Sequence, residues 1–145
     1  MKDLTCKQKK ALAKIGHKNH LDKLVDDPDD SVRFMVVQHG HMEHLDKLVG
    51  DSLQLTRYQV VKHGYKHHLD KLVRDSDHVI RYLVADNGHP EHLNILVDDP
   101  VSIVRYRVAK HGNNDHLDKL IEDKDEGVRY IAERRLKELK NVTER

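Results

Sequence analysis

The chain repeats itself every 24 residues, and this period constrains its fold more than any other feature. The motif His-Leu-Asp-Lys-Leu-Val begins at His20, returns at His44 and His68, and recurs in altered form at His92 and His116, with no insertion between units. A unit of this length cannot bury its own apolar face. Neighbouring units must therefore stack to form a continuous core, as they do in helical repeat proteins.

Each unit predicts two short helices. In the first unit they cover residues 20–26 and 30–39, where apolar side chains have the spacing of one helical face. Gly40 ends the second helix, because glycine adopts the left-handed conformation at a helix C-terminus without a side-chain clash. The same position holds Gly64, Gly88 and Gly112 in later units. No segment alternates with period two, so we expect no strand.

These units predict a single repeat domain over residues 1–145. The expected segments are an N-terminal capping half repeat (1–19), five repeats (20–43, 44–67, 68–91, 92–115 and 116–139) and a C-terminal tail (140–145). The last repeat carries Glu133 where other units have an apolar residue, and no glycine follows it. It therefore resembles the polar capping repeat that such arrays need.

The pattern Leu-x-x-Leu-Val-x-Asp-Pro-x-x-x-Val-Arg-x-x-Val-Val, repeated over residues 8–139, resembles the leucine-rich repeat variant, a short relative of HEAT-like repeats. The resemblance implies an all-α, right-handed superhelical solenoid in which α-helices alternate with short or 3₁₀ helices. The type example of the family carries an iron–sulfur cluster domain ahead of its repeats. This chain has one cysteine, Cys6, so we expect no cofactor. Such repeats serve many functions, and the resemblance implies a fold and no particular activity.

In every full unit an aspartate is followed six residues later by an arginine. A guanidinium has five donors and can bridge a carboxylate and backbone carbonyls. The pairs are therefore interpreted as a structural ladder that joins each corner, the turn between the two helices of a unit, to the corner of the neighbouring unit. The alternative is a row of guanidinium groups that binds phosphate or carboxylate; recurrence in every unit favours the ladder. The pairs are Asp27/Arg33, Asp51/Arg57, Asp75/Arg81, Asp99/Arg105 and Asp123/Arg129.

An aromatic residue follows each of these arginines. At 100° per residue it lies away from the apolar face of the second helix, on the side that also carries basic residues. Two interpretations remain open: the rings pack against the adjacent unit, or they form a binding stripe. The candidate binding residues are Phe34, Tyr58, Lys62, Tyr82, Tyr106, Arg107, Lys110 and Tyr130.

The charge pattern leaves two kinds of partner open. The chain has 26 Lys and Arg against 25 Asp and Glu, but six lysines and one aspartate give residues 1–19 a net charge of +5. We expect a non-enzymatic scaffold that binds another protein through the tyrosine-bearing face of the second helices. The alternative is a nucleic-acid-binding module, for DNA or RNA, that uses the same face and the basic N-terminal cap.

Catalytic and metal sites have little support in the sequence. It contains no Gly-rich phosphate loop, no Gly-x-Ser-x-Gly motif and no zinc-protease motif, so we expect no catalytic residues. The chain has 13 histidines, including the i, i+3 pairs His17/His20, His41/His44 and His89/His92. None of these pairs has a third ligand one turn away, so we expect no metal site.

We also expect a cytoplasmic protein with no membrane partner. No apolar run approaches the ~20 residues that span a bilayer. The first residues lack the apolar stretch of a secretory signal.

Overall fold

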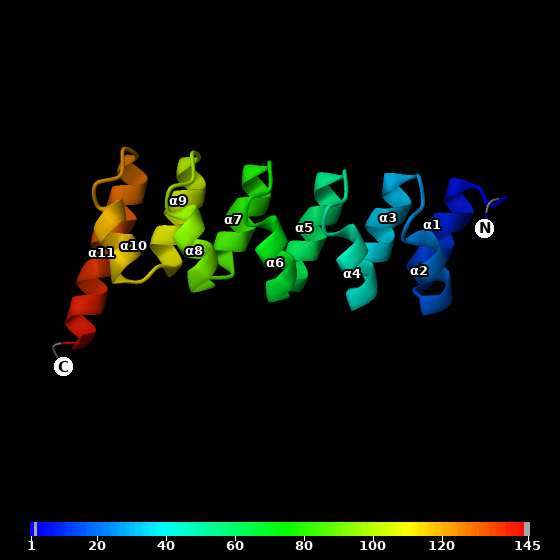
Figure 1. Ribbon diagram of the computed structural model, residues 1–145, viewed down its shortest axis with the longest axis horizontal. Helices are drawn as coiled ribbons and strands as arrows, with labels where there is room; N and C mark the ends of the chain where they lie inside the picture. Colours follow the sequence, from blue (N-terminus) through cyan, green and yellow to red (C-terminus); the bar gives the residue numbers. More distant parts are fainter. Residues whose placement is uncertain (2, 144–145) are drawn as a thin grey trace. The chain divides into compact units, whose positions relative to one another are not determined.

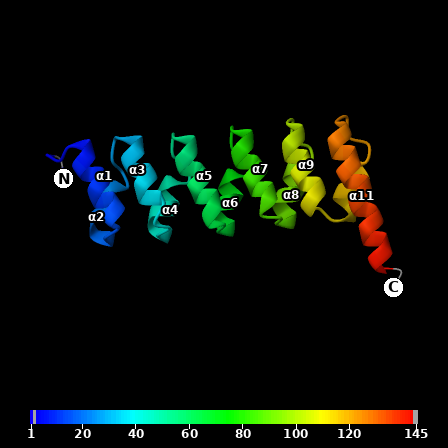
Figure 2. The ribbon, with the colours of Figure 1, turned by 180° about the vertical axis from the view of Figure 1, so that it is seen from behind.

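The computed structural model describes residues 1 and 3–143, without the side chains of residues 142 and 143. Over this part of the chain it contains eleven α-helices and no strand. The chain divides into two compact units, Met1–Leu72 and Val73–Arg145. Figures 1 and 2 show the helices of both units from opposite sides.

The first unit consists of three stacked helix pairs. Its helices are α1 (Cys6–Ile15), α2 (Lys18–Leu24), α3 (Asp30–Val37), α4 (Met42–Leu48), α5 (Gln54–His63) and α6 (Lys66–Leu72). Helix α3 packs against both α1 and α5, and each short helix packs against its neighbours in sequence (Figure 1).

The second unit continues the same pattern. Its helices are α7 (His78–Asp86), α8 (Pro90–Leu96), α9 (Ser102–His111), α10 (Asn114–Leu120) and α11 (Glu126–Thr143). Helix α9 packs against α7 and α11, while α8 and α10 pack beside them (Figure 1). The prediction of an all-α fold built from stacked helix pairs is therefore confirmed within each unit.

The helix boundaries differ from those expected in three respects, the first being that α3 ends at Val37 and not at residue 39. The short helices are seven-residue α-helices, and α2 begins and ends two residues before the predicted 20–26. Helix α11 runs to Thr143, four residues past the expected end of the last repeat. Its sequence after Ala132 has no glycine and no proline, so nothing in the chain stops the helix at residue 139.

The core is made by the same repeat positions in every pair. Leu21, Leu24, Val32 and Val36 are fully buried in the first unit, and residues at equivalent positions are buried in the second. Burying one such side chain stabilises the fold by roughly 1.5–3 kcal/mol. The short helices are held by this packing, because an isolated helix of seven residues is unstable in water.

Four of the repeat glycines lie in the left-handed region, with φ between +68° and +79°. Gly16 and Gly40 also make room for a ring of the next pair: a Cβ would lie 2.6 Å from Cε1 of His39 or His63, respectively. We call α1, α3, α5, α7, α9 and α11 the long helices. Each of the two rings contacts a backbone carbonyl near the C-terminus of the preceding long helix, and Nε2 of His39 lies 2.7 Å from the Ala13 carbonyl oxygen.

Gly112 does not follow the expected pattern, because it is extended, with φ −69° and ψ 160°. The residue after it, Asn113, caps α10: its side chain accepts from the His116 backbone N–H, and the His116 ring accepts from the Asn113 backbone N–H. A capping box thus begins this helix, where α4 and α8 begin after a histidine with no side-chain cap.

Candidate functional site

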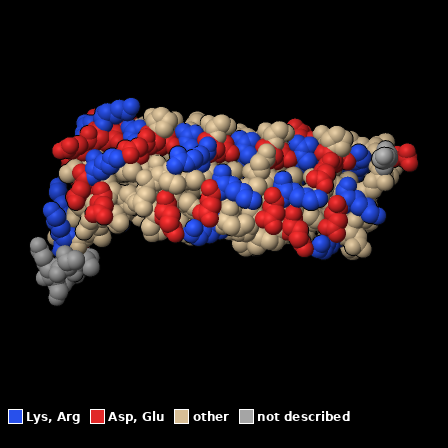
Figure 3. Space-filling view, in the orientation of Figure 1, with Lys and Arg blue, Asp and Glu red and all other residues tan. Residues whose placement is uncertain are grey.

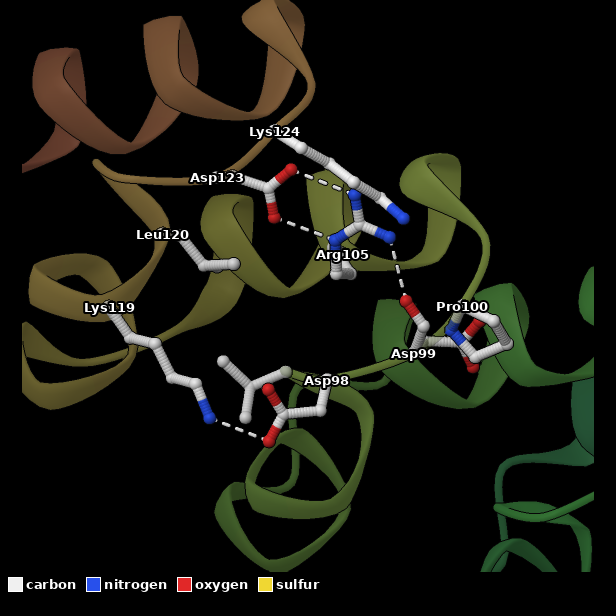
Figure 4. Close-up of a pocket in the computed structure, with 9 residues that line it drawn as sticks. Asp98, Asp99, Pro100, Arg105, Lys119, Leu120, Asp123 and Lys124 are labelled. Atoms are coloured by element: carbon white, nitrogen blue, oxygen red, sulfur yellow. Dashed lines mark hydrogen bonds and ion pairs between the residues drawn. The ribbon is translucent and has the colours of Figure 1, made fainter.

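The corners of the repeats hold a ladder of ion pairs, and Figure 4 shows the one formed by Arg105 and Asp123. Nε and Nη2 of Arg105 donate to the two oxygens of Asp123, over 2.6 and 2.8 Å, and Nη1 donates to the backbone carbonyl of Asp99 over 2.7 Å. Arg105 is only 5% exposed. This two-point contact holds the α9 corner to the α11 corner.

The same geometry recurs at Arg33 with Asp51 and at Arg81 with Asp99. The spacing of six residues therefore joins Arg33, Arg81 and Arg105 to the backbone carbonyl of the preceding aspartate, and their carboxylate partners lie 18 residues further on. Arg57 also donates to the backbone carbonyl of Asp51, and Arg129 donates to that of Asp123, in each case six residues earlier in the chain.

The charged groups of the Asp99 and Arg105 corner already have partners within the second unit. Oδ1 of Asp99 also accepts from the Val101 backbone N–H, over 2.9 Å. The hydrogen bonds from Arg105 hold the pKa of Asp123 below its usual value. A hollow of about 330 Å³ lies beside this pair, but its Lys119 and Asp98 are already joined over 2.6 Å. The geometry favours the structural interpretation of the ladder over a ligand-binding one.

The tyrosine-bearing face is partly packed. Phe34, Tyr58, Tyr82 and Tyr106 are half-buried, whereas Tyr130 is 64% exposed. The four half-buried rings therefore lie at the surface of the long helices but remain partly covered by neighbouring side chains. Of the basic residues on this face, Lys62 and Lys110 are exposed, and Lys62 lies 5.9 Å from the centre of the Tyr58 ring.

Arg107 connects two helices of this face. Its guanidinium lies 4.3 Å from the centre of the Tyr82 ring, and Nη1 is 3.0 Å from Oδ1 of Asp86, so it links α9 to α7. His111 contacts the same carboxylate over 3.1 Å. Burial lowers the pKa of Arg107. The positive charge of Arg107 is thus already paired with a carboxylate of the same unit.

An apolar groove lies between α7 and α9, with a volume of about 260 Å³, lined by His78, Val79, Tyr82 and Ile103. Val79 and Ile103 are 36% and 46% exposed although both are large apolar residues. Sequence reasoning missed them. The available signal was their position three residues before Tyr82 and Tyr106, which places them on the same helical face.

The groove has a counterpart residue in the first unit. Leu55 occupies the equivalent repeat position, three residues before Tyr58, and is 53% exposed. The terminal repeats carry Ser31 and Gly127 there. Exposed apolar side chains at this position are therefore confined to the central repeats.

The expected histidine pairs contact each other edge to face, with ring centres 5.3 to 5.8 Å apart. A different set gathers instead in the first unit: Asp46, His67 and His68 place one donor atom each within 4.8 Å of one another. We call these three residues the Asp–His cluster. Sequence reasoning missed it because its members lie one and 21 residues apart, spacings that join two helices of a stack and not one helical face.

The basic N-terminal cap is partly neutralised by contacts within the first unit. Lys9 pairs with Asp27 over 2.8 Å, and Lys18 lies 3.3 Å from Asp22 and 3.6 Å from Glu43. On the face shown in Figure 3, Lys and Arg alternate with Asp and Glu in each unit and form no single-sign patch.

No helix among the described residues has the length and apolar character needed to cross a membrane.

The comparisons agree with the repeat pattern. A solved structure described as a leucine-rich repeat variant with a novel repetitive protein structural motif matches at a TM-score of 0.78 and 32% identity. The match covers 86% of this chain and 53% of the other, so the chain spans about half the length of that protein. No protein-family model and no curated protein matches. The chain is a helical repeat protein that is similar to this leucine-rich repeat variant, the resemblance that its sequence predicted.

Proposed function

We propose that the protein is a non-enzymatic scaffold that binds another protein through the tyrosine-bearing face of its long helices. The observation that carries the proposal is the groove between α7 and α9, where Val79 and Ile103 are exposed beside the half-buried Tyr82. Stacked repeats present extended surfaces of this kind for binding. In this interpretation the groove receives apolar side chains of the partner.

The lining of the groove favours a protein partner over a nucleic acid. Aromatic anchors with adjacent apolar side chains are typical of the energetic centre of protein interfaces. Nucleic-acid affinity depends on cations that are available to phosphates. Arg107 at this face is stacked on Tyr82 and paired with Asp86, and Lys9 and Lys18 of the N-terminal cap are paired as well.

A double substitution taken from the repeat itself tests the groove. Val79→Ser with Ile103→Ser places at both positions the residue that the first full repeat carries there, Ser31. The matched control is Ile95→Lys on α8: Ile95 is an exposed apolar residue outside the groove lining, and all four other full repeats have lysine at its position. Only the groove variant is expected to weaken binding.

The measurement has two stages. Partners are first captured from cells with the wild-type chain, with and without nuclease, and identified by mass spectrometry. The affinity of the purified partner is then measured for each variant. We expect the double variant to bind at least about tenfold more weakly, because interface energy is concentrated in a few central contacts. Equal affinity of the double variant and wild type would contradict the groove, and nuclease-sensitive capture with steep salt dependence would favour the nucleic-acid alternative.

A further inference from the structure

The Asp–His cluster lies between α4 and α6 of the first unit. Oδ1 of Asp46 is 2.8 Å from Nε2 of His68 and 3.1 Å from Nε2 of His67. The two imidazole rings are close to each other, with centres 3.8 Å apart. One carboxylate oxygen and two ring nitrogens thus converge on one point.

Half of this cluster is a standard contact of the repeats. His44 contacts Asp22 over 2.7 Å, and His116 contacts Asn94 over 2.8 Å, at the positions that His68 and Asp46 occupy. His67 is the departure, because the other repeats carry no histidine there. The equivalent residues are Asn19, Glu43, Glu91 and Asp115. The repeat contact explains His68, and it leaves the second imidazole on the same oxygen without a structural reason.

The spacing of the three atoms matches that of ligands around one metal ion. Zinc binds histidine nitrogen and carboxylate oxygen at about 2.0–2.2 Å in a tetrahedron, so two of its ligand atoms lie about 3.3 Å apart. The contacts of 2.8 and 3.1 Å are already near that value, and all three atoms lie within 4.8 Å of one another. An ion can enter with small movements of the two exposed side chains.

We propose that Asp46, His67 and His68 bind one divalent transition-metal ion of the zinc class. Two imidazole nitrogens with one carboxylate suit zinc, cobalt, nickel or copper better than calcium or magnesium, which prefer oxygen ligands. His68 is fully buried and fixes one ligand, while Asp46 and His67 are about half exposed and give the ion access from solvent. Water fills the remaining coordination position, as in open zinc sites.

Two substitutions remove a ligand and retain residues that the repeats already use. Asp46→Asn reproduces the Asn94–His116 contact, and His67→Asn reproduces Asn19. His78→Asn is the matched control, because it removes one exposed histidine in the second unit. The purified full-length chain is titrated with Zn²⁺ in a calorimeter and with Co²⁺ by visible absorption, and the melting temperature is measured with and without Zn²⁺.

We expect the wild type and His78→Asn to bind one equivalent of Zn²⁺ and to melt at a higher temperature with it, since a ligand specific to the folded state stabilises that state. Both cluster variants should bind at least about tenfold more weakly, since even loss of an outer-shell partner costs 10–100-fold. Absence of saturable binding in the wild type would overturn the proposal. Equal binding by the wild type and both folded cluster variants would also overturn it, by assigning the metal to other histidines.

Discussion

Two sets of side chains recur from repeat to repeat in the second unit, and they differ in what surrounds them. At the corners, Arg105 is 5% exposed and every nitrogen of its guanidinium donates a hydrogen bond to Asp123 or Asp99. On the face of the long helices, Val79 and Ile103 are more than one-third exposed and line an apolar groove. Recurrence alone therefore does not distinguish structural residues from binding residues.

The two sets differ in whether their groups already have partners within the protein. At the corner, the polar groups are hydrogen-bonded to the next repeat, so a ligand would find few free donors or acceptors there. The groove leaves apolar area in contact with water, and covering that area is favourable at about 25 cal/mol per Å². We therefore propose that the corner serves stability and the groove serves binding, and the following predictions test this proposal, beginning with the largest expected effect on stability.

Arg105→Ala should lower the free energy of unfolding by about 3 kcal/mol or more. Removing one partner of a buried ion pair leaves the other charge uncompensated, here that of Asp123. Urea unfolding followed by circular dichroism measures the effect. Lys119→Ala is the control, because the Lys119–Asp98 pair is exposed, and pairs of this kind contribute at most about 1 kcal/mol. Equal midpoints for the two variants would show that the corner is not a stabilising element.

The buried histidines predict a smaller, pH-dependent effect. Nε2 of His116 contacts the side-chain oxygen of Asn94, and Nδ1 accepts from the Asn113 backbone N–H, so the neutral ring satisfies both partners. A second proton on Nδ1 would face that N–H, and burial lowers the pKa of His116. The folded-state pKa thus lies below the unfolded value near 6.5. Stability from the neutral ring is present above that value and is lost as the pH falls below it.

His116→Gln checks this assignment. Glutamine at this position of a capping box can still accept from the Asn113 N–H, but it does not titrate. We expect the variant to lose less stability than the wild type when urea midpoints at pH 7.5 and pH 5 are compared. The same loss in both proteins would show that other groups cause the acid sensitivity.

Much of the fold was predictable from the sequence because it depends on local patterns. The 24-residue period predicts the stacked pairs, and the glycines predict where most long helices end. Asp99 shows the limit of such patterns. Its spacing from Arg105 predicts a contact, but the carboxylate of Asp99 pairs with Arg81 of the preceding repeat, and Arg105 reaches its backbone carbonyl. The distance between stacked repeats determines this pairing, so it cannot be predicted from the spacing of residues within one repeat.

The candidate sites were less predictable for a related reason. The exposure of Val79 depends on how far Tyr82 and Ile103 cover it, and Asp46 meets His67 only because α4 and α6 stack. Both sites arise from neighbouring repeats. Sequence reasoning identified the tyrosine side of the groove from a recurring aromatic, but its apolar side is shared by only three repeats.

The smallest expected change in stability is that of the groove variant, and it gives the sharpest test of the difference between the groove and the packed parts of the molecule. Val79→Ser with Ile103→Ser should alter the free energy of unfolding by less than about 1 kcal/mol, because exposed substitutions away from buried contacts have small effects. Val84→Ser in the same helix should instead cost several kcal/mol, since this fully buried side chain would be replaced by a cavity and an unpaired hydroxyl. Thermal and urea unfolding of both variants measure the difference. If the groove variant lost as much stability as Val84→Ser, Val79 and Ile103 would be packing residues and the groove would be part of the core. If it unfolded like the wild type while losing its partner, the apolar groove would be a binding surface that stability does not require.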